Sequence, residues 1–171
     1  MTRFFDYMGL FSIFKKEPEP TVVPNDSIKA LVNGILFEGD EVFLRWSSDI
    51  EADKLYIKKE YRADRTIYHW GERSILNSLK LPFKTVCWNH KQHGETKSFE
   101  SIEFSIERPD AEKYFRSVNE HIEAIFGVPK RNEDVHPDDI SLEWRIKPVK
   151  ISLSLYNKEY PKLNFEIGCW L

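Results

Sequence analysis

Two groups of acidic side chains are the residues of this chain with the clearest capacity for chemistry. Asp49, Glu51 and Asp53 alternate along the chain after an apolar segment that ends at Trp46. The second group lies in a polar stretch and consists of Glu133, Asp134, Asp138 and Asp139. Carboxylates grouped in this way can bind a divalent cation, or can act as the acid and the base of a hydrolase.

Neither acidic group has the ligand spacing of an EF-hand loop, and acidic loops are commonly no more than solvated surface. We therefore rank recognition of a basic partner above catalysis, with metal-assisted hydrolysis as the alternative. The sequence also lacks a glycine-rich phosphate loop, a Gly-x-Ser-x-Gly elbow and a His-Glu-x-x-His helix. We expect no cofactor and, on balance, no enzymatic activity.

Soft metal ligands occur near the middle of the chain. Cys87, His90 and His93 are three residues apart, a spacing that can present a thiolate and two imidazoles to zinc. Structural zinc sites usually take four ligands from two such clusters, and the other histidines offer no second cluster. We expect no metal, with zinc binding by these three residues left open. Cys87 and Cys169 both lie in apolar segments, which predicts buried free thiols.

The overall charge restricts the class of partner. With a net charge of −3 over 171 residues, the chain is not expected to bind nucleic acid. Its most basic stretch contains Lys58, Lys59, Arg62 and Arg65, which we interpret as the solvated face of a strand pair. No segment is long and apolar enough to span a membrane, and no cleavage site of a signal peptide is recognisable, so we expect a cytoplasmic protein.

The N-terminal segment, residues 1–16, is apolar, and helical spacing places Phe4, Phe11 and Phe14 on one face. Three alternatives account for these side chains: the segment packs on its own domain, enters a groove of a partner, or lies in a membrane interface. Exposed aromatic residues in such number are an aggregation hazard, so we expect them to be buried by one of the three.

Domain boundaries follow from composition. Residues 17–24 contain three prolines and predict a semi-rigid linker. Residues 25–171 have the size and apolar content of a single α+β domain that needs no disulfide.

Hydrophobic periodicity predicts the elements of this domain. Residues 109–126 have the spacing of one long amphipathic helix, and residues 140–146, 149–155 and 163–169 alternate as strands with one buried face. The fold class is therefore α+β, a mainly antiparallel sheet with this helix and shorter helices packed on one face.

The first half of the domain is less regular. We expect a helix over residues 27–36, a strand at 42–46 and a hairpin of 55–61 with 66–70. A short helix over 74–79 and a strand pair of 83–88 with 99–106 complete the prediction.

The order of elements from 109 to 170, a helix that stops at Gly127 and Pro129 and then strands around Trp144 and 151–155, resembles the C-terminal half of small bacterial α+β proteins. Some of these are immunity proteins that neutralise a toxin encoded beside them. The resemblance implies a cytoplasmic protein whose acidic, aromatic-bearing surface binds one protein partner, a toxin from an adjacent gene.

The residues expected to contact that partner are Asp49, Glu51, Asp53, Phe4, Phe11 and Phe14. The alternatives are a metal-assisted hydrolase that uses an acidic group, and a peripheral membrane protein that contacts lipid through residues 4–16. The oligomeric state does not follow from the sequence.

Overall fold

The fold is that of a computed structural model, which describes residues 26–53, 55–88, 98–107, 109–157 and 161–169. The predicted apolar segment 1–16 and linker 17–24 lie outside the described residues. The same is true of Phe4, Phe11 and Phe14, whose predicted contact with a partner stays a prediction.

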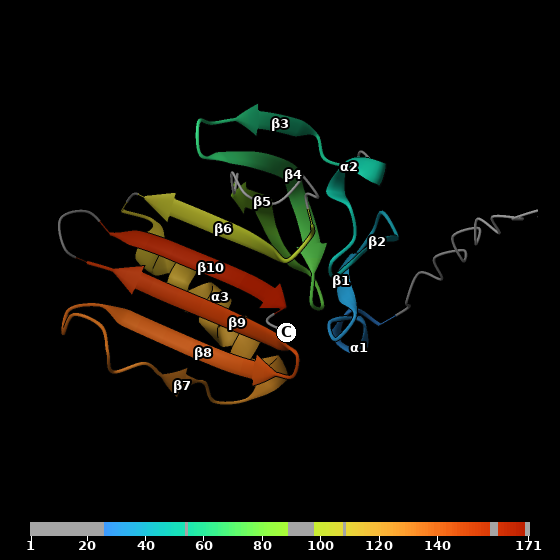
Figure 1. The fold of residues 1–171 in the computed structure, drawn as a ribbon. Coiled ribbons are helices and arrows are strands. Elements are labelled where there is room, and N and C mark those ends of the chain that lie inside the picture. The colour runs from blue at the N-terminus through green and yellow to red at the C-terminus, as the bar shows by residue number, and fades with distance from the viewer. Residues whose placement is uncertain (1–25, 54, 89–97, 108, 158–160, 170–171) are drawn as a thin grey trace, which may run out of the picture.

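An antiparallel sheet of eight strands forms the centre of the structure, in the order β3-β4-β5-β6-β10-β9-β8-β7 (Figure 1). The strands are β3 (Lys58–Tyr61), β4 (Arg65–Ile75), β5 (Leu79–Trp88), β6 (Ser101–Glu107), β7 (Lys130–Arg131), β8 (Ile140–Ile146), β9 (Val149–Tyr156) and β10 (Lys162–Cys169). The short strands β3 and β7 are its two edges.

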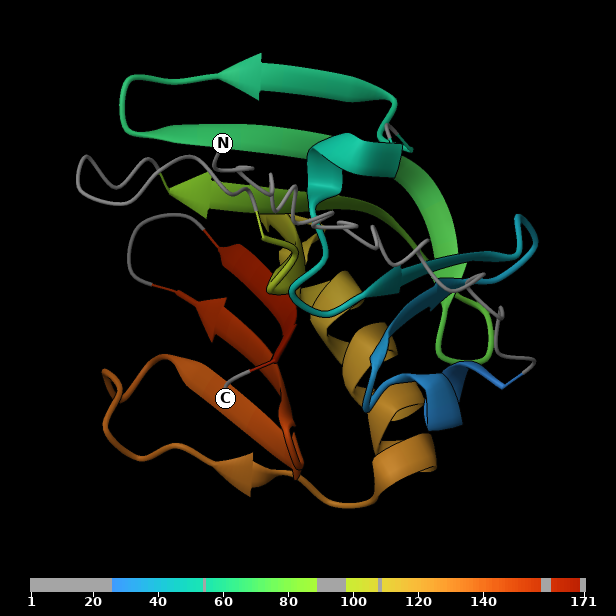
Figure 2. The ribbon, with the colours of Figure 1, turned by 45° about the vertical axis from the view of Figure 1, so that its right-hand side comes forward.

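One long helix, α3 (Ala111–Phe126), lies against one face of this sheet, here called the inner face (Figure 2). Its buried side chains include Phe115, Val118 and Ile122, which belong to the same core cluster as the inward residues of β6, β9 and β10. Strand alternation places Ser, Asn, Lys and Glu side chains on the opposite, outer face. The α+β class with a mainly antiparallel sheet is thus confirmed.

A hairpin of β1 (Gly34–Phe37) and β2 (Val42–Arg45) covers the other end of the inner face. Strand β1 packs on β4, with the ring centroids of Phe37 and Trp70 5.7 Å apart. Two helices of four residues each, α1 (Ser27–Ala30) and α2 (Ile50–Asp53), flank this hairpin.

Phe99 connects the hairpin to the large sheet. Its ring is fully buried, stacks on Trp46 at a centroid distance of 5.2 Å and meets the ring of Trp70 edge-on at 6.0 Å. Its backbone N–H donates to the Ser48 carbonyl oxygen at 2.8 Å, and its own carbonyl oxygen accepts from the Ser47 N–H at 2.7 Å. One residue therefore ties the segment after β2 to the start of β6.

The predicted helix over residues 74–79 is wrong. The chain instead makes the turn between β4 and β5, and Leu76, Asn77 and Ser78 all have positive φ. Such residues strain the backbone unless other contacts hold them. Here the carboxylate of Glu38 accepts the N–H groups of Asn77 and Ser78 at 2.8 and 2.7 Å, and Nε2 of His121 lies 2.6 Å from the Leu76 carbonyl oxygen.

The predicted helix over residues 27–36 is also wrong beyond its first turn. Asp26 caps α1 as expected, by accepting the N–H groups of Ile28 and Lys29. The chain then becomes β1, which pairs with β2, and this pairing requires glycine at position 34, because any Cβ there would be 2.1 Å from the Leu44 carbonyl oxygen. All four residues of β1 are buried. A continuous apolar run of this length is compatible with a strand that is covered on both faces as well as with a helix.

The other predicted elements are present, although β4 continues to Ile75, β5 begins at Leu79, and α2 and β7 were not predicted. The strand at 42–46 and the hairpin of 55–61 with 66–70 correspond to β2 and to β3 with β4. The pair of 83–88 with 99–106 is β5 with β6, which shares one sheet with the C-terminal strands. Those strands are β8, β9 and β10, within a residue or two of the predicted bounds. The long helix begins at Ala111, two residues later than predicted.

Removal of the Phe99 ring should destabilise the fold as a whole. We expect Phe99→Ala to lower the free energy of unfolding by about 3 to 5 kcal/mol, because the cavity would lie between two tryptophan rings. Urea denaturation followed by tryptophan fluorescence measures this. The control is Val128→Ala, at a side chain that is 83% exposed, which should change the free energy of unfolding by less than about 0.5 kcal/mol. Equal effects of the two variants would contradict the assigned role of Phe99.

Candidate functional site

The β3–β4 hairpin forms one corner of the molecule. Arg62 N–H donates to the Arg65 carbonyl oxygen at 2.8 Å, which leaves Ala63 and Asp64 as a two-residue turn. Strand β3 pairs with β4 on one side, and no described strand pairs with its other side. The hairpin is therefore one edge of the sheet as far as the described strands go, with several side chains around it.

A half-buried carboxylate, that of Glu51, holds β3 in place. Lys59 Nζ and the Tyr68 hydroxyl both donate to Oε1 of Glu51, and the Tyr56 hydroxyl donates to Oε2 at 3.2 Å. Glu51 belongs to α2, whereas Lys59 lies in β3 and Tyr68 in β4. The three donors thus join one short helix to two strands through a single carboxylate, and these four side chains are called the Glu51 cluster.

The protonation states in the Glu51 cluster follow from these contacts. The hydrogen bonds from Lys59 and Tyr68 lower the pKa of Glu51 from 4.5 to about 2. The same hydrogen bond from Lys59 raises the pKa of that ammonium above its usual range. Burial, and then the Glu51 carboxylate, raise the pKa of the Tyr68 hydroxyl. The cluster therefore holds one negative and one positive charge at neutral pH, with both tyrosines protonated.

The first predicted acidic group is thus used within the protein. Glu51 has the three donors described above, and Asp49 Oδ1 accepts the N–H of Glu51 at 2.9 Å at the start of α2. Asp53 is the last residue of α2, and its side chain lies outside what the structure describes. Direct contact of these three residues with a partner stays a prediction.

Three large apolar side chains are strongly exposed around β3 and the end of β5. Ile57 is 67% exposed, Tyr61 is 69% exposed and Trp88 is 56% exposed. The Arg65 guanidinium carbon lies 5.0 Å from the centroid of the Trp88 ring, and Lys59 Nζ lies 4.8 Å from that of Tyr61. Such cation–π contacts orient the aromatic rings.

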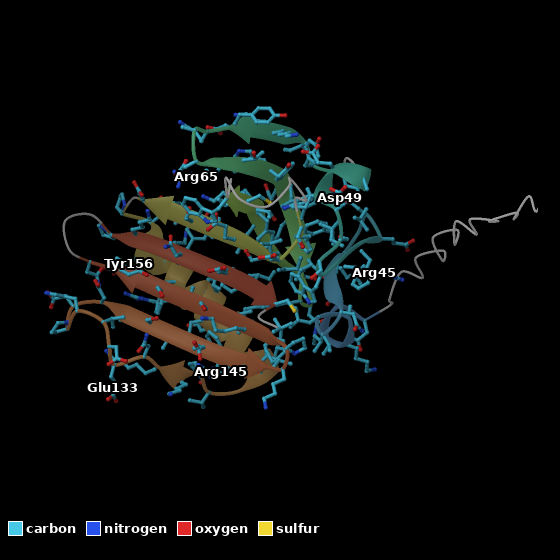
Figure 3. The ribbon with its side chains drawn as sticks, in the orientation of Figure 1. Arg45, Asp49, Arg65, Glu133, Arg145 and Tyr156 are labelled. Carbon is cyan, nitrogen blue, oxygen red and sulfur yellow. The ribbon has the colours of Figure 1, made fainter. Side chains whose placement is uncertain are left out.

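We call the set Ile57, Tyr61, Arg62, Arg65 and Trp88 the β3 corner. Arg65 is labelled at this corner in Figure 3. Strand register places Arg65 opposite Trp88 on the outer face and Tyr61 opposite Thr66 on the inner face. The β3 corner therefore has side chains on both faces of the sheet beside the edge strand β3.

The basic stretch around β3 agrees only in part with its interpretation as solvated surface. The side chains of Arg62 and Arg65 are 59% and 39% exposed. The Lys59 side chain is only 17% exposed, because it lies beneath Glu51 and against the rings of Tyr61 and Tyr68. Lys59 therefore belongs to the support of the corner.

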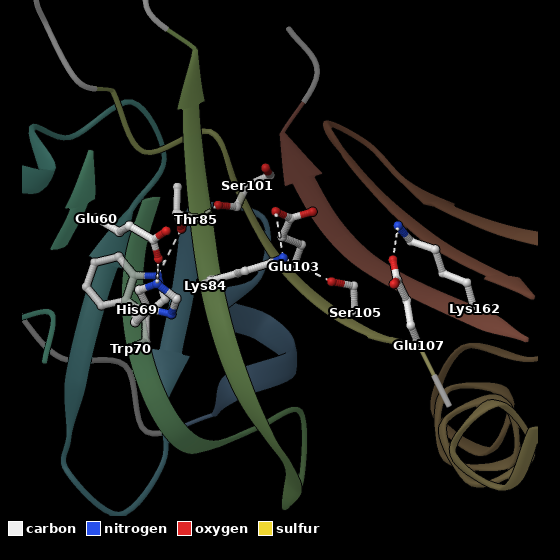
Figure 4. A network of polar contacts seen from close by, with 10 residues as sticks. All are labelled: Glu60, His69, Trp70, Lys84, Thr85, Ser101, Glu103, Ser105, Glu107 and Lys162. Atoms are coloured by element: carbon white, nitrogen blue, oxygen red, sulfur yellow. Dashed lines mark hydrogen bonds and ion pairs between the residues drawn. The ribbon is translucent and has the colours of Figure 1, made fainter. Parts of the chain in front are cut away.

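The outer face of the sheet has charges that mostly compensate one another (Figure 4). Lys84 Nζ donates to Ser105 Oγ at 2.9 Å and lies 3.8 Å from Glu103, and Lys162 lies 2.8 Å from Glu107. Glu166 makes no ion pair within the described part of the chain, and burial together with the neighbouring Glu103 raises its pKa. Two exposed aromatic residues of the described strands lie on this face, Trp88 at the β3 corner and Tyr156 at the end of β9.

The second predicted acidic group supports the loop before β8. Asp139 Oδ1 accepts the Asn157 N–H at 2.9 Å, and Asp134 N–H donates to Asn132 Oδ1 at 3.1 Å. Asp138 lies 3.6 Å from His136. These contacts shape the loop, and Figure 3 shows Asp49 of the first group far from Glu133 of the second.

Among the described residues, no three His, Cys, Asp or Glu side chains converge as metal ligands would. His90 and His93 lie outside those residues, so zinc binding with Cys87 stays a prediction. Cys87 and Cys169 are free thiols of intermediate burial. Within the described ranges, no helix combines the length and apolarity needed to cross a bilayer.

Comparisons with known proteins give no family. No family model, curated protein or solved structure matches this chain.

Tyr61 and Trp88 are not among the site residues predicted from the sequence. A signal for Trp88 exists in the alternation of β5, where the buried residues are Leu79, Leu81, Phe83 and Thr85. Trp88 lies on the other face of β5 from these residues, so the alternation of a strand predicts that its ring faces solvent. Strand alternation does not predict the exposure of Tyr61. This residue lies on the same face of β3 as Lys59, whose side chain is half-buried.

Loss of the Glu51 charge should destabilise the corner in a pH-dependent way. We expect Glu51→Gln to lower the free energy of unfolding at pH 7 by about 2 kcal/mol, because three donors lose a charged acceptor. Since folding lowers the pKa of Glu51, its contribution is present above pH 4.5 and is lost as the pH falls toward about 2.

Urea denaturation of the wild-type protein and Glu51→Gln at several pH values measures this difference. The difference in free energy of unfolding between the two proteins should become smaller as the pH falls from 4.5 toward about 2. Asp64→Asn, at an exposed turn residue, is the control and should have little effect at any pH. A difference that is constant with pH would contradict the assigned ionisation of Glu51.

Proposed function

We propose that this protein is a non-enzymatic, immunity-type binding protein, which neutralises a cognate toxin by binding it through the β3 corner. The observation that carries the binding part of this proposal is the exposure of Ile57, Tyr61 and Trp88 beside two arginines. Large apolar side chains grouped on a surface are a mark of interaction sites.

The residue types at the β3 corner support a protein partner. Tryptophan, tyrosine and arginine are enriched among the few residues that dominate the binding energy of protein interfaces. A ring held by a neighbouring cation also loses less conformational freedom on binding. The Arg65–Trp88 and Lys59–Tyr61 contacts provide this at both rings.

The toxin-neutralising part of the proposal rests on the resemblance of residues 109–170 to immunity proteins in the order of their elements. In this proposal the long helix α3 and the strands after it are the scaffold that supports the sheet. The complex would form in the cytoplasm, where such a protein meets the toxin before the toxin reaches its target. Metal-assisted hydrolysis and lipid contact through residues 4–16 stay predictions.

Co-expression tests the proposal. The product of each adjacent gene is expressed alone and together with the full-length protein, and growth is followed. We expect one product to stop growth alone, to be neutralised by this protein and to co-purify with it. If no adjacent product is toxic, or if a toxic one is neutralised without forming a complex, the proposal is wrong.

Truncation of the exposed tryptophan should weaken the complex. We expect Trp88→Ala to raise the dissociation constant at least about 30-fold, as at an interface anchor worth about 2 kcal/mol. Isothermal titration calorimetry with the captured partner measures this. Tyr156→Ala, which removes another exposed ring on the same sheet, is the control and should bind as the wild type does. Equal affinities of the two variants would move the interface away from the β3 corner.

A further inference from the structure

Arg65 is held in place without the use of its side-chain hydrogen-bond donors. Its backbone carbonyl oxygen accepts the Arg62 N–H, and its guanidinium carbon lies 5.0 Å from the centroid of the Trp88 ring. The distance from its Nη1 to Asp64 Oδ2, 3.8 Å, is too long for a hydrogen bond. The guanidinium makes no hydrogen bond with any residue that the structure describes, so its N–H groups are available to an acceptor from a partner.

Three other arginines, within the large sheet or next to it, have a close carboxylate partner inside the protein. They form the ion pairs Arg62–Glu60, Arg73–Asp40 and Arg145–Glu143. Arg65 lacks a carboxylate at hydrogen-bond distance among the described residues, and it lies across the hairpin turn from Arg62. Like charges that face each other in a strand pair are destabilising. The positive charge of Arg65 is therefore only weakly compensated within the protein.

The surroundings of Arg65 indicate the chemistry of the acceptor. A guanidinium that lies over an aromatic ring can present its N–H groups sideways, in pairs that match the two oxygens of a carboxylate or phosphate. The net charge of −3 disfavours a polyanion such as nucleic acid. The Trp88 ring, which is 56% exposed, provides apolar surface beside the guanidinium. The place therefore fits a carboxylate with an apolar side chain next to it, which is what a protein surface supplies.

We propose that Arg65 binds an aspartate or glutamate side chain of the protein partner. The carboxylate of the partner accepts two N–H groups of the Arg65 guanidinium, and an apolar side chain next to it packs on the exposed part of the Trp88 ring. The second arginine at the turn, Arg62, adds to the positive potential that attracts the carboxylate. The inference rests on the proposed function, because it assigns one contact of the partner within the β3 corner.

Two matched probes test this contact directly. They are acetyl-Phe-Glu-amide and acetyl-Phe-Gln-amide, which differ only in the carboxylate. Each is titrated into the isotopically labelled full-length protein, and NMR follows the Arg65 Nε–H and Trp88 Nε1–H signals. We expect the Glu probe to shift both signals saturably and to bind at least about tenfold more tightly than the Gln probe, because a hydrogen-bonded charge is lost in the latter. No shift of the Arg65 signal, or equal binding of the two probes, would overturn the inference.

Two variants with the same change of charge locate the binding. We expect Arg65→Gln to weaken binding of the Glu probe at least about tenfold. Arg145→Gln is the control and should bind this probe as the wild type does, because the Arg145 Nε–H already donates to Glu143 and the residue lies far from Arg65 (Figure 3). Equal affinities of the two variants would overturn the inference. The comparison of the two probes uses the wild-type protein, so it decides the inference even where Arg65→Gln does not fold.

Inorganic phosphate, as a third probe, separates the two anions that a guanidinium pairs with. Saturation of the Arg65 signal by phosphate at a lower concentration than by the Glu probe would show a phosphate site, and the assigned carboxylate would be wrong. If a neutralised toxin binds Arg65→Gln as tightly as the wild type, the carboxylate contact is wrong while the proposed function stands. If no toxin exists but the Glu probe binds with the expected dependence on Arg65, the carboxylate site stands and the toxin-neutralising function fails.

Discussion

The arrangement of this protein depends on a sheet that is apolar on one face only and is wider than the helix that covers it. Helix α3 packs on β9 and β10, and the β1–β2 hairpin covers β4. Strand β3 lies beyond both covers. Its inner face is polar at Lys59, and this side chain is satisfied by the carboxylate of Glu51. At this end of the sheet, where apolar packing ends, the ion pair and hydrogen bonds of the Glu51 cluster therefore hold the strands together.

This support has a consequence for binding. An edge strand of four residues at the margin of a core would be expected to open locally. The carboxylate of Glu51 joins β3 and β4 to α2, so the ring of Tyr61 stands on a fixed backbone. A surface whose shape is set before binding loses less entropy when a partner docks. The acidic residue singled out in the sequence thus contributes to the corner from beneath.

The sequence predicts the C-terminal half of the fold well, because α3, β8, β9 and β10 each present one apolar face of regular period. It fails where tertiary contacts override local pattern. The turn at Leu76 and Asn77 depends on Glu38, which is distant in sequence, and β1 depends on the fit of Gly34 against Leu44. At the site, no local pattern predicts that Glu51 accepts hydrogen bonds from Lys59 and Tyr68. The exposure of Trp88 does follow from the sequence, because alternation along β5 places it on the face opposite the buried residues.

The central claim is that the Glu51 cluster fixes β3 against the sheet. The most direct measurement is amide hydrogen exchange, residue by residue, in the wild-type protein and in Glu51→Gln. The account predicts faster exchange in the variant at the amides that β3 donates to β4, such as Arg62, with unchanged exchange in α3. Unchanged exchange in β3, or an equal increase throughout the protein, would contradict it.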